Sequence, residues 1–200
     1  MIFWAFIAFI IVFGTLFYFW LKRRTSRKIL DSLALKLFLV RLPQTSPEGK
    51  DLKQEINLTE QFFAALAAFK KPIIFEAAVP FLGEEIHFYT AVPKNFSEAL
   101  MRQIQSLWPN AQVEPVEDYN IFNYGGVSLG AWVGQKNQVA LPLRTYQEIG
   151  NDTFLPLLGA LTKINEIGEG GAIQIIIEPA HPHFKKAIQS KISALKKGEK

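Results

Sequence analysis

The first 21 residues constrain this chain most, because they contain no charged side chain. As a helix, a run of that length spans roughly 31 Å, which matches the hydrocarbon thickness of a bilayer. Trp4, Tyr18 and Trp20 lie near its ends, where aromatic rings prefer the membrane interface. The sequence therefore predicts a transmembrane helix over residues 1–21.

A basic segment follows this apolar run at residues 22–34. Its basic side chains are Lys22, Arg23, Arg24, Arg27 and Lys28. Basic residues beside a membrane span stay on the cytoplasmic side, so we expect a single-pass protein of the inner membrane with its N-terminus outside and its body in the cytoplasm. A cleaved signal peptide would carry its basic residues before the apolar run. We interpret the segment as a juxtamembrane linker that also contacts anionic lipid.

The remaining charges are unevenly distributed. Residues 29–184 contain 17 acidic and 11 basic residues, whereas residues 185–200 contain six lysines and one glutamate. A folded face that binds nucleic acid is expected to be basic, so any nucleic-acid contact of the body is expected to be indirect. The absence of cysteine excludes disulfides, thiolate metal sites and cysteine nucleophiles.

Apolar periodicity predicts a first α+β unit over residues 35–118. The expected strands are 35–42, 73–79, 85–92 and 111–116, and the expected helices are 58–70 and the segment between Asn95 and Pro109. Asn57 with Glu60, and Asn95 with Glu98, have the spacing of helix capping boxes. We interpret the stripe Phe62, Phe63, Leu66 and Phe69 as core packing. The order β-α-β-β-α-β is the ferredoxin-like pattern, which predicts one antiparallel sheet with both helices on one face.

A second, incomplete ββαβα unit is predicted over residues 119–180, continuing into a basic helix within 181–200. Its expected elements are strands at 127–133 and 138–143, a helix capped by Asn151 or Asp152, and a strand at 172–177. The predicted fold class is therefore α+β, with an N-terminal transmembrane helix ahead of two units.

Catalytic and cofactor signatures are weak in this sequence. No P-loop motif occurs, and Gly168, Gly170 and Gly171 precede a strand, so a tight turn is favoured over a phosphate cradle. His181 and His183 could approach one metal ion, but a zinc site needs at least a third ligand. We therefore predict a non-enzyme with no metal, cofactor or small-molecule substrate.

Loop aromatics and one arginine are the candidate partner contacts: Tyr119, Phe122, Tyr124, Arg144 and Tyr146. Aromatic side chains in loops can anchor a partner protein, although they can equally cover the core, which is the interpretation we favour for the first three. Arg144 could pair with Glu148 or Asp118, or contact a neighbouring subunit.

Several segments carry a family resemblance: Leu35–Pro43, E-Q-F-F-A-A-L at 60–66, I-I-F-E-A at 73–77, I-H-F-Y-T-A-V-P at 86–93, Q-I-Q-S-L-W-P-N-A at 103–111, L-P-L-R-T-Y at 141–146 and I-Q-I-I-I-E-P at 173–179. Together they resemble the membrane-anchored N-terminal region that precedes the ATPase in coupling-type proteins of conjugative transfer, or type IV secretion. These segments are strand and helix patterns, and the nucleotide-binding motif of the family's ATPase core is missing from this chain.

The resemblance implies a place in a ring-forming membrane motor that moves single-stranded DNA or protein. The motor would then be a separate polypeptide or a continuation beyond Lys200. We expect a non-catalytic interaction module that oligomerises or docks with a motor ATPase. The alternative is a membrane-tethered protein that binds single-stranded nucleic acid.

Overall fold

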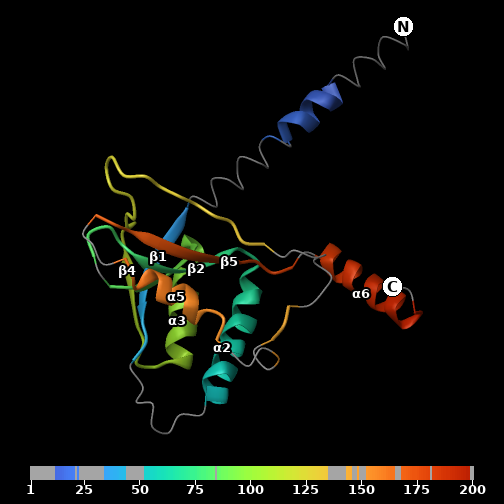
Figure 1. Ribbon diagram of the computed structural model, residues 1–200. Helices are drawn as coiled ribbons and strands as arrows, with labels where there is room; N and C mark the ends of the chain where they lie inside the picture. Colours follow the sequence, from blue (N-terminus) through green and yellow to red (C-terminus); the bar gives the residue numbers. More distant parts are fainter. Residues whose placement is uncertain are drawn as a thin grey trace.

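Among the residues that the structure describes, five antiparallel strands form one sheet, and helices cover one of its two faces (Figure 1). The computed structural model describes residues 12–20, 22, 34–43, 52–83, 85–134, 143–145, 148, 152–164, 168–180 and 182–198. The labelled elements are β1 (Leu35–Arg41), α2 (Leu52–Leu66), β2 (Ile73–Val79), β3 (His87–Pro93), α3 (Ser97–Leu107), β4 (Gln112–Val116), α5 (Leu155–Leu161), β5 (Gly171–Ile177) and α6 (Pro182–Lys196). The chain is therefore a mixed α+β protein.

The strand order across the sheet is β4-β1-β3-β2-β5. The first four strands with α2 and α3 follow one another as β-α-β-β-α-β, and every pairing is antiparallel. The predicted order of these elements and their single antiparallel sheet are confirmed. Successive side chains of a strand point to opposite faces, so Phe38 lies on the face of α2 and α3 while Leu39 lies on the other. We call these the helical face and the opposite face.

The main core lies between the helical face and helices α2 and α3. Phe38 and Val92 from the sheet and Leu100 from α3 are fully buried there. Phe62 and Leu66 of α2 complete this cluster. Burial of each such side chain contributes about 1.5–3 kcal/mol to folding, which is why the apolar stripes of these helices face the sheet.

Helix α5 packs on the helical face at the other end of β2. Its Leu161 is buried against Ala77 and Val79. The backbone N–H groups of Phe154 and Leu155 donate hydrogen bonds to the Asp152 carboxylate at 2.8 and 3.1 Å. Asp152 thus caps the turn that leads into α5, whereas the N-cap residue of the helix, Phe154, makes no side-chain cap hydrogen bond.

The other two predicted caps are wrong. Helix α2 begins at Leu52, so Asn57 lies inside the helix rather than at its start. The half-buried side chains of Ile56 and Leu58 extend the apolar part of the helix toward the N-terminus. The negative charge of Glu55 in the first turn interacts favourably with the helix dipole. Asn95 lies in a 3-10 turn before α3, which begins without a side-chain cap hydrogen bond.

The predicted strand 127–133 does not form. Residues 126–134 have no regular structure, and Val127, Leu129 and Trp132 are almost fully exposed. A strand needs a neighbour to satisfy its backbone groups, and this segment pairs with no described strand. Its predicted partner, 138–143, lies outside the described residues except for Leu143.

Strand β5 joins the first sheet instead of a separate one. It pairs with β2 over its whole length, from Ile73 opposite Ile177 to Val79 opposite Gly171. The predicted strand itself is confirmed, but its neighbour is β2 rather than a strand of residues 119–143. Within the described ranges β5 is the last strand of the sheet, so one of its edges pairs with no described strand, and much of its side-chain surface is exposed.

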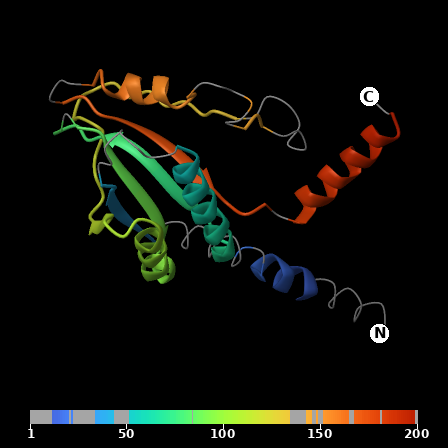
Figure 2. The same ribbon diagram turned by 90° about the horizontal axis from the view of Figure 1, so that it is seen from below.

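The helical residues 12–20 and helix α6 lie away from the sheet-and-helix body in both views (Figures 1 and 2). Residues 12–20 and 22 are helical, whereas residues 1–11, 21 and 23–33 of the predicted anchor and linker lie outside the described residues. No helix within the described residues is both long and apolar enough to cross a bilayer. The predicted basic C-terminal helix is present as α6, which has no buried residue.

Candidate functional site

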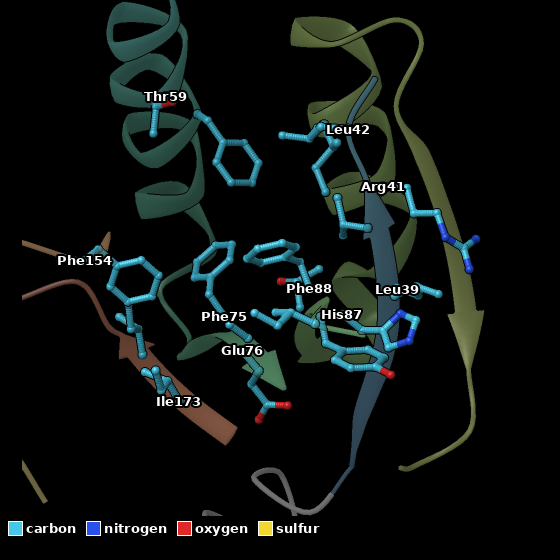
Figure 3. Close-up of a pocket in the computed structure, with 18 of the residues that line it drawn as sticks. Leu39, Arg41, Leu42, Thr59, Phe75, Glu76, His87, Phe88, Phe154 and Ile173 are labelled. Atoms are coloured by element: carbon cyan, nitrogen blue, oxygen red, sulfur yellow. The ribbon is translucent and has the colours of Figure 1, made fainter. Parts of the chain in front are cut away.

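A groove of about 750 Å³ opens on the helical face beside α2, over strands β1, β2, β3 and β5 (Figure 3). Its lining is mostly apolar and includes Phe63 of α2, Phe75 of β2 and Ile175 of β5. Phe154, which precedes α5, and Ile173 close the other side. We call this surface the β5 groove.

Aromatic rings form one wall of the β5 groove. Phe63 and Phe75 meet edge to face with ring centroids 5.6 Å apart, and Phe62 meets Trp108 in the same way at 5.7 Å. Phe62 is buried, whereas 40% of its neighbour Phe63 is exposed. Phe88 of β3 also lines the groove and is 49% exposed. This exposure leaves large rings available for a further apolar contact.

The groove continues toward the end of β5. A smaller hollow of about 70 Å³ lies beside it and shares Phe63 as a wall. Leu66, Ile73 and Ile177 line this hollow. An apolar surface therefore follows the helical face of β5 from Ile173 to Ile177, a distance of roughly 13 Å at the rise of a strand.

Charged groups at the β5 groove are few. The Arg41 guanidinium lies 3.2 Å from the Glu114 carboxylate on neighbouring β4, so its charge is partly balanced. Glu85 lines the rim and is exposed. Glu76 also lines the groove, and Lys71 and Glu178 line the smaller hollow beside it. Charged groups of both signs therefore border a mostly apolar floor.

One buried hydroxyl at the groove is unsatisfied. Thr90 is 1% exposed, and its Oγ1 has no hydrogen-bond partner within the described part of the chain. A buried hydroxyl without a partner costs about 1–3 kcal/mol. The Thr90 hydroxyl is therefore a buried polar group without a described partner in a mostly apolar lining.

The opposite face of the sheet is partly covered by the chain that follows β4. The rings of Tyr119 and Tyr89 stack with centroids 4.4 Å apart and an interplanar angle of 12°. The Tyr119 hydroxyl donates a 2.7 Å hydrogen bond to Glu76 Oε2, and the Gln174 amide donates to Glu76 Oε1. We call this group the tyrosine latch; it links the segment after β4 with strands β2, β3 and β5.

The tyrosine latch changes the ionisation of both phenols. Burial raises the pKa of Tyr119, and its hydrogen bond to the negative Glu76 raises it further. Burial also raises the pKa of Tyr89, against the opposing effect of the positive Arg41. Both hydroxyls therefore stay protonated at neutral pH and act as hydrogen-bonding groups.

Two backbone hydrogen bonds fix the chain that follows Tyr119 and the glycine-rich segment before β5. Phe81 N–H donates to the Asn120 carbonyl at 3.1 Å, and Gly168 N–H donates to the Phe81 carbonyl at 2.8 Å. A Cβ atom at Gly170 would overlap the backbone carbonyl of Ile121. The glycine-rich segment thus permits close approach of two backbones, as expected for the turn predicted there, and leads directly into β5.

The predicted partner contacts are not brought together. Tyr119 is half-buried in the tyrosine latch, whereas Phe122 and Arg144 are exposed and Tyr124 is fully exposed. Tyr146 lies outside the described residues. Their role as contacts stays a prediction.

The predicted membrane-interface residues are described only in part. Tyr18, Trp20 and Lys22 are helical and exposed. Trp4, Arg23, Arg24, Arg27 and Lys28 lie outside the described residues, so the predicted interface also stays a prediction.

The sequence disfavours both a metal site and a phosphate site. Within the described ranges, no group of three or more histidine or acidic side chains is placed to hold a metal ion. His183 lies in the first turn of α6, and His181 lies outside the described residues. His87 lies on the opposite face, where its ring is 6.1 Å from that of Tyr89.

The β5 groove itself was not predicted. The sequence interpretation treated Phe62, Phe63 and Leu66 alike as core, which is correct for Phe62 and Leu66. The available signal was the density of phenylalanine in two segments, Phe62-Phe63 and Phe88, beside a strand with three consecutive isoleucines at 175–177. Comparison of the chain with models of known protein families, with curated proteins and with solved structures found no match.

Proposed function

We propose that this chain is a non-catalytic, membrane-anchored interaction module of a type IV secretion or conjugative DNA-transfer machine. In this proposal the β5 groove is the surface through which it docks with a motor ATPase or a sister subunit. The observation that carries the proposal is the exposed aromatic and aliphatic lining of that groove, which includes Phe63, Phe88 and Ile175.

The groove has the character of a protein-docking site. Large apolar patches on a protein surface commonly mark interaction sites, and buried aromatic anchors supply much of the binding energy of an interface. The apolar row of roughly 13 Å along β5 suits two turns or more of an amphipathic helix, whose apolar residues recur every three or four positions. An apolar helix of a partner is therefore the expected ligand of the β5 groove.

Membrane attachment is the second part of the proposal. The uncharged run 1–21, followed by five basic residues at 22–28, supports an anchor with the body on the cytoplasmic side. Anchoring confines subunits to two dimensions and raises their effective concentration, so weak docking contacts suffice. The family resemblance supports placing this module beside a DNA-transfer motor.

The finer description of the fold is also a proposal. The order β4-β1-β3-β2, with α2 and α3 on one face, supports a ferredoxin-like unit over residues 35–118. Strand β5 then widens this unit at the β2 edge and supplies one wall of the groove. Fold alone does not specify function, so the docking role depends on the groove.

Co-purification tests the proposal. The full chain is expressed with a candidate P-loop ATPase supplied as a separate polypeptide, and the complex is recovered from detergent-solubilised membranes. We expect the substitution Phe88→Glu to reduce recovery strongly, because it places a charge in the apolar groove. The matched control Gln112→Glu adds the same charge on exposed β4 and leaves recovery unchanged. Deletion of residues 1–21 abolishes recovery from membranes.

Two outcomes would overturn this proposal. Unchanged recovery with Phe88→Glu removes the docking role of the groove. A complex that forms equally well in the cytosol without residues 1–21 removes the role of the anchor.

A further inference from the structure

The chain carries a second uncovered apolar surface on helix α6. Phe184, Ile188, Ile192 and Leu195 are all exposed, and their spacing of four, four and three residues places them on one side of the helix. Helix α6 has no buried residue and stands away from the body in both views (Figures 1 and 2). An amphipathic helix normally covers such a stripe with another apolar surface.

We propose that α6 of one copy of this chain occupies the β5 groove of a second copy. The inference rests on the proposed docking function, because it names the occupant of the same groove. It makes the interface between copies heterologous, with a helix on one copy and a groove on the other, and such an interface closes into an exchanged dimer or a ring.

The two surfaces match in length. The stripe from Phe184 to Leu195 covers eleven residues of rise, or roughly 16 Å along the helix axis. The apolar row of β5 on the helical face runs from Ile173 to Ile177, roughly 13 Å, and Phe154 and Phe63 extend it. Helix α6 is therefore long enough to follow the whole apolar row on the β5 side of the groove.

The two surfaces also match in charge. Helix α6 contains Lys185, Lys186, Lys191 and Lys196 and no acidic residue. Three carboxylates, those of Glu76, Glu85 and Glu178, line the groove or the hollow beside it, together with Lys71 and with Arg41, which is paired with Glu114. The body around the groove has more acidic than basic residues. Lysines that flank the stripe would lie beside these carboxylates while their stems cover apolar surface.

The connection to α6 favours a second copy over the helix's own groove. Only residues 178–181 separate the end of β5 from Pro182, the first residue of α6. Pro179 disfavours a helical conformation for Glu178, so the chain leaves β5 in an extended direction. A helix that folded back onto its own β5 would have to reverse direction within these few residues. A short, stiff connection of this kind favours exchange between copies.

Disulfide trapping between two differently tagged chains tests the proposal directly, because the natural chain has no cysteine. One chain carries Ile188→Cys or Ile192→Cys on the stripe of α6, and the other carries Ile175→Cys in the groove. The matched controls are Gln189→Cys and Ser193→Cys, which lie on the other side of α6. The two full chains are mixed in mild detergent and oxidised.

We expect a disulfide that joins the two tags with a stripe cysteine and not with a control cysteine, because a disulfide requires Cα atoms within about 7 Å. Ile188→Glu is expected to weaken self-association by about tenfold or more, since it buries a charge, whereas Gln189→Glu is expected to leave self-association unchanged.

Three results would overturn the inference. A disulfide that forms only within a chain carrying both I188C and I175C shows that α6 covers its own groove. An I192C thiol that forms no disulfide and is shielded from maleimide only by vesicles of anionic lipid shows that α6 binds a membrane surface. The third result is that no disulfide forms between or within chains and that vesicles give no shielding, while Phe88→Glu still disrupts the complex with the ATPase. That result removes the inference and leaves the proposed docking function intact.

Discussion

The ring of Tyr119 stacks on that of Tyr89 at 4.4 Å, and the Tyr119 hydroxyl donates a hydrogen bond to Glu76, 43 residues away in the sequence. This contact places the chain after β4 across the face of the sheet that the helices leave open. It covers the ring of Tyr89. The apolar surface left open is instead on the helical face, at the β5 groove.

Removal of the Tyr119 hydroxyl is expected to destabilise the body. Tyr119→Phe keeps the stacked ring but deletes a hydrogen bond to a charged acceptor, which is worth about 1.5–3 kcal/mol. Urea unfolding of the purified chain in mild detergent measures the change in the free energy of unfolding. Tyr124→Phe is the matched control, because Tyr124 is fully exposed, and it should leave that free energy unchanged. Equal effects of the two substitutions contradict the tyrosine latch.

The same hydroxyl predicts a loss of stability in alkali. The folded chain holds the Tyr119 proton more tightly than the unfolded chain, whose phenol ionises near its ordinary pKa of 10. Below that pH both states are protonated and the contribution is fully present. Above it the unfolded state loses its proton first, so the free energy of unfolding falls as pH rises. Between neutral pH and strong alkali, the free energy of unfolding should therefore fall more steeply for the natural chain than for Tyr119→Phe. Parallel profiles contradict the raised pKa.

Two glycines should respond in opposite directions to alanine. Gly170→Ala places a methyl group on the backbone of Ile121 and should unfold the latch segment or destabilise the chain by about 1–3 kcal/mol. Gly159 lies in α5 with open space around it, so Gly159→Ala should stabilise by about 0.5–1 kcal/mol through helix propensity. Thermal unfolding compares the two variants. A tolerated Gly170→Ala removes the close backbone approach.

The unsatisfied hydroxyl of Thr90 predicts a stabilising substitution. Thr90→Val keeps the shape of the side chain and removes a buried polar group without a described partner, so the free energy of unfolding should rise by about 1 kcal/mol. Thr59→Val serves as the contrast, because the Thr59 hydroxyl donates a 2.9 Å hydrogen bond to the Glu55 carbonyl and its loss should give no gain. Urea unfolding of both variants measures the difference. Destabilisation by Thr90→Val means that this hydroxyl has a partner in the folded protein.

Local patterns in the sequence predict much of the sheet. The strand over 73–79 has the predicted bounds, and the strands that begin at Leu35 and end at Ile177 differ from prediction by one residue. These segments are short, apolar and bounded by proline, glycine or polar residues, so their signal is contained within each segment. The start of α2 differs from the prediction. Asn57 and Glu60 have the spacing of a capping box, but they lie inside a helix that begins five residues before Asn57.

The site could not be predicted in the same way, because it depends on contacts between distant segments. Phe62 and Phe63 are adjacent and chemically identical and both line the groove, yet Phe62 is buried in the core and Phe63 is 40% exposed. The groove also depends on the position of β5, which pairs with β2 across about a hundred residues of sequence. The apolar sequence of β5 predicts a strand but does not predict that the strand pairs with β2. Without that pairing, Ile173 and Ile175 would not line the groove.

Solvent access to the groove tests the central claim most directly. A single Ile175→Cys substitution places a thiol in the β5 groove, and Gln112→Cys places one on exposed β4 as a control. Maleimide labelling rates are measured in isolated membranes and after dilution of the solubilised chain. We predict that the I175C thiol reacts about tenfold more slowly in membranes than after dilution, because a docked apolar segment covers it, while the Q112C thiol reacts equally in both. Equal rates for I175C in the two states would contradict the claim that the groove is a docking surface.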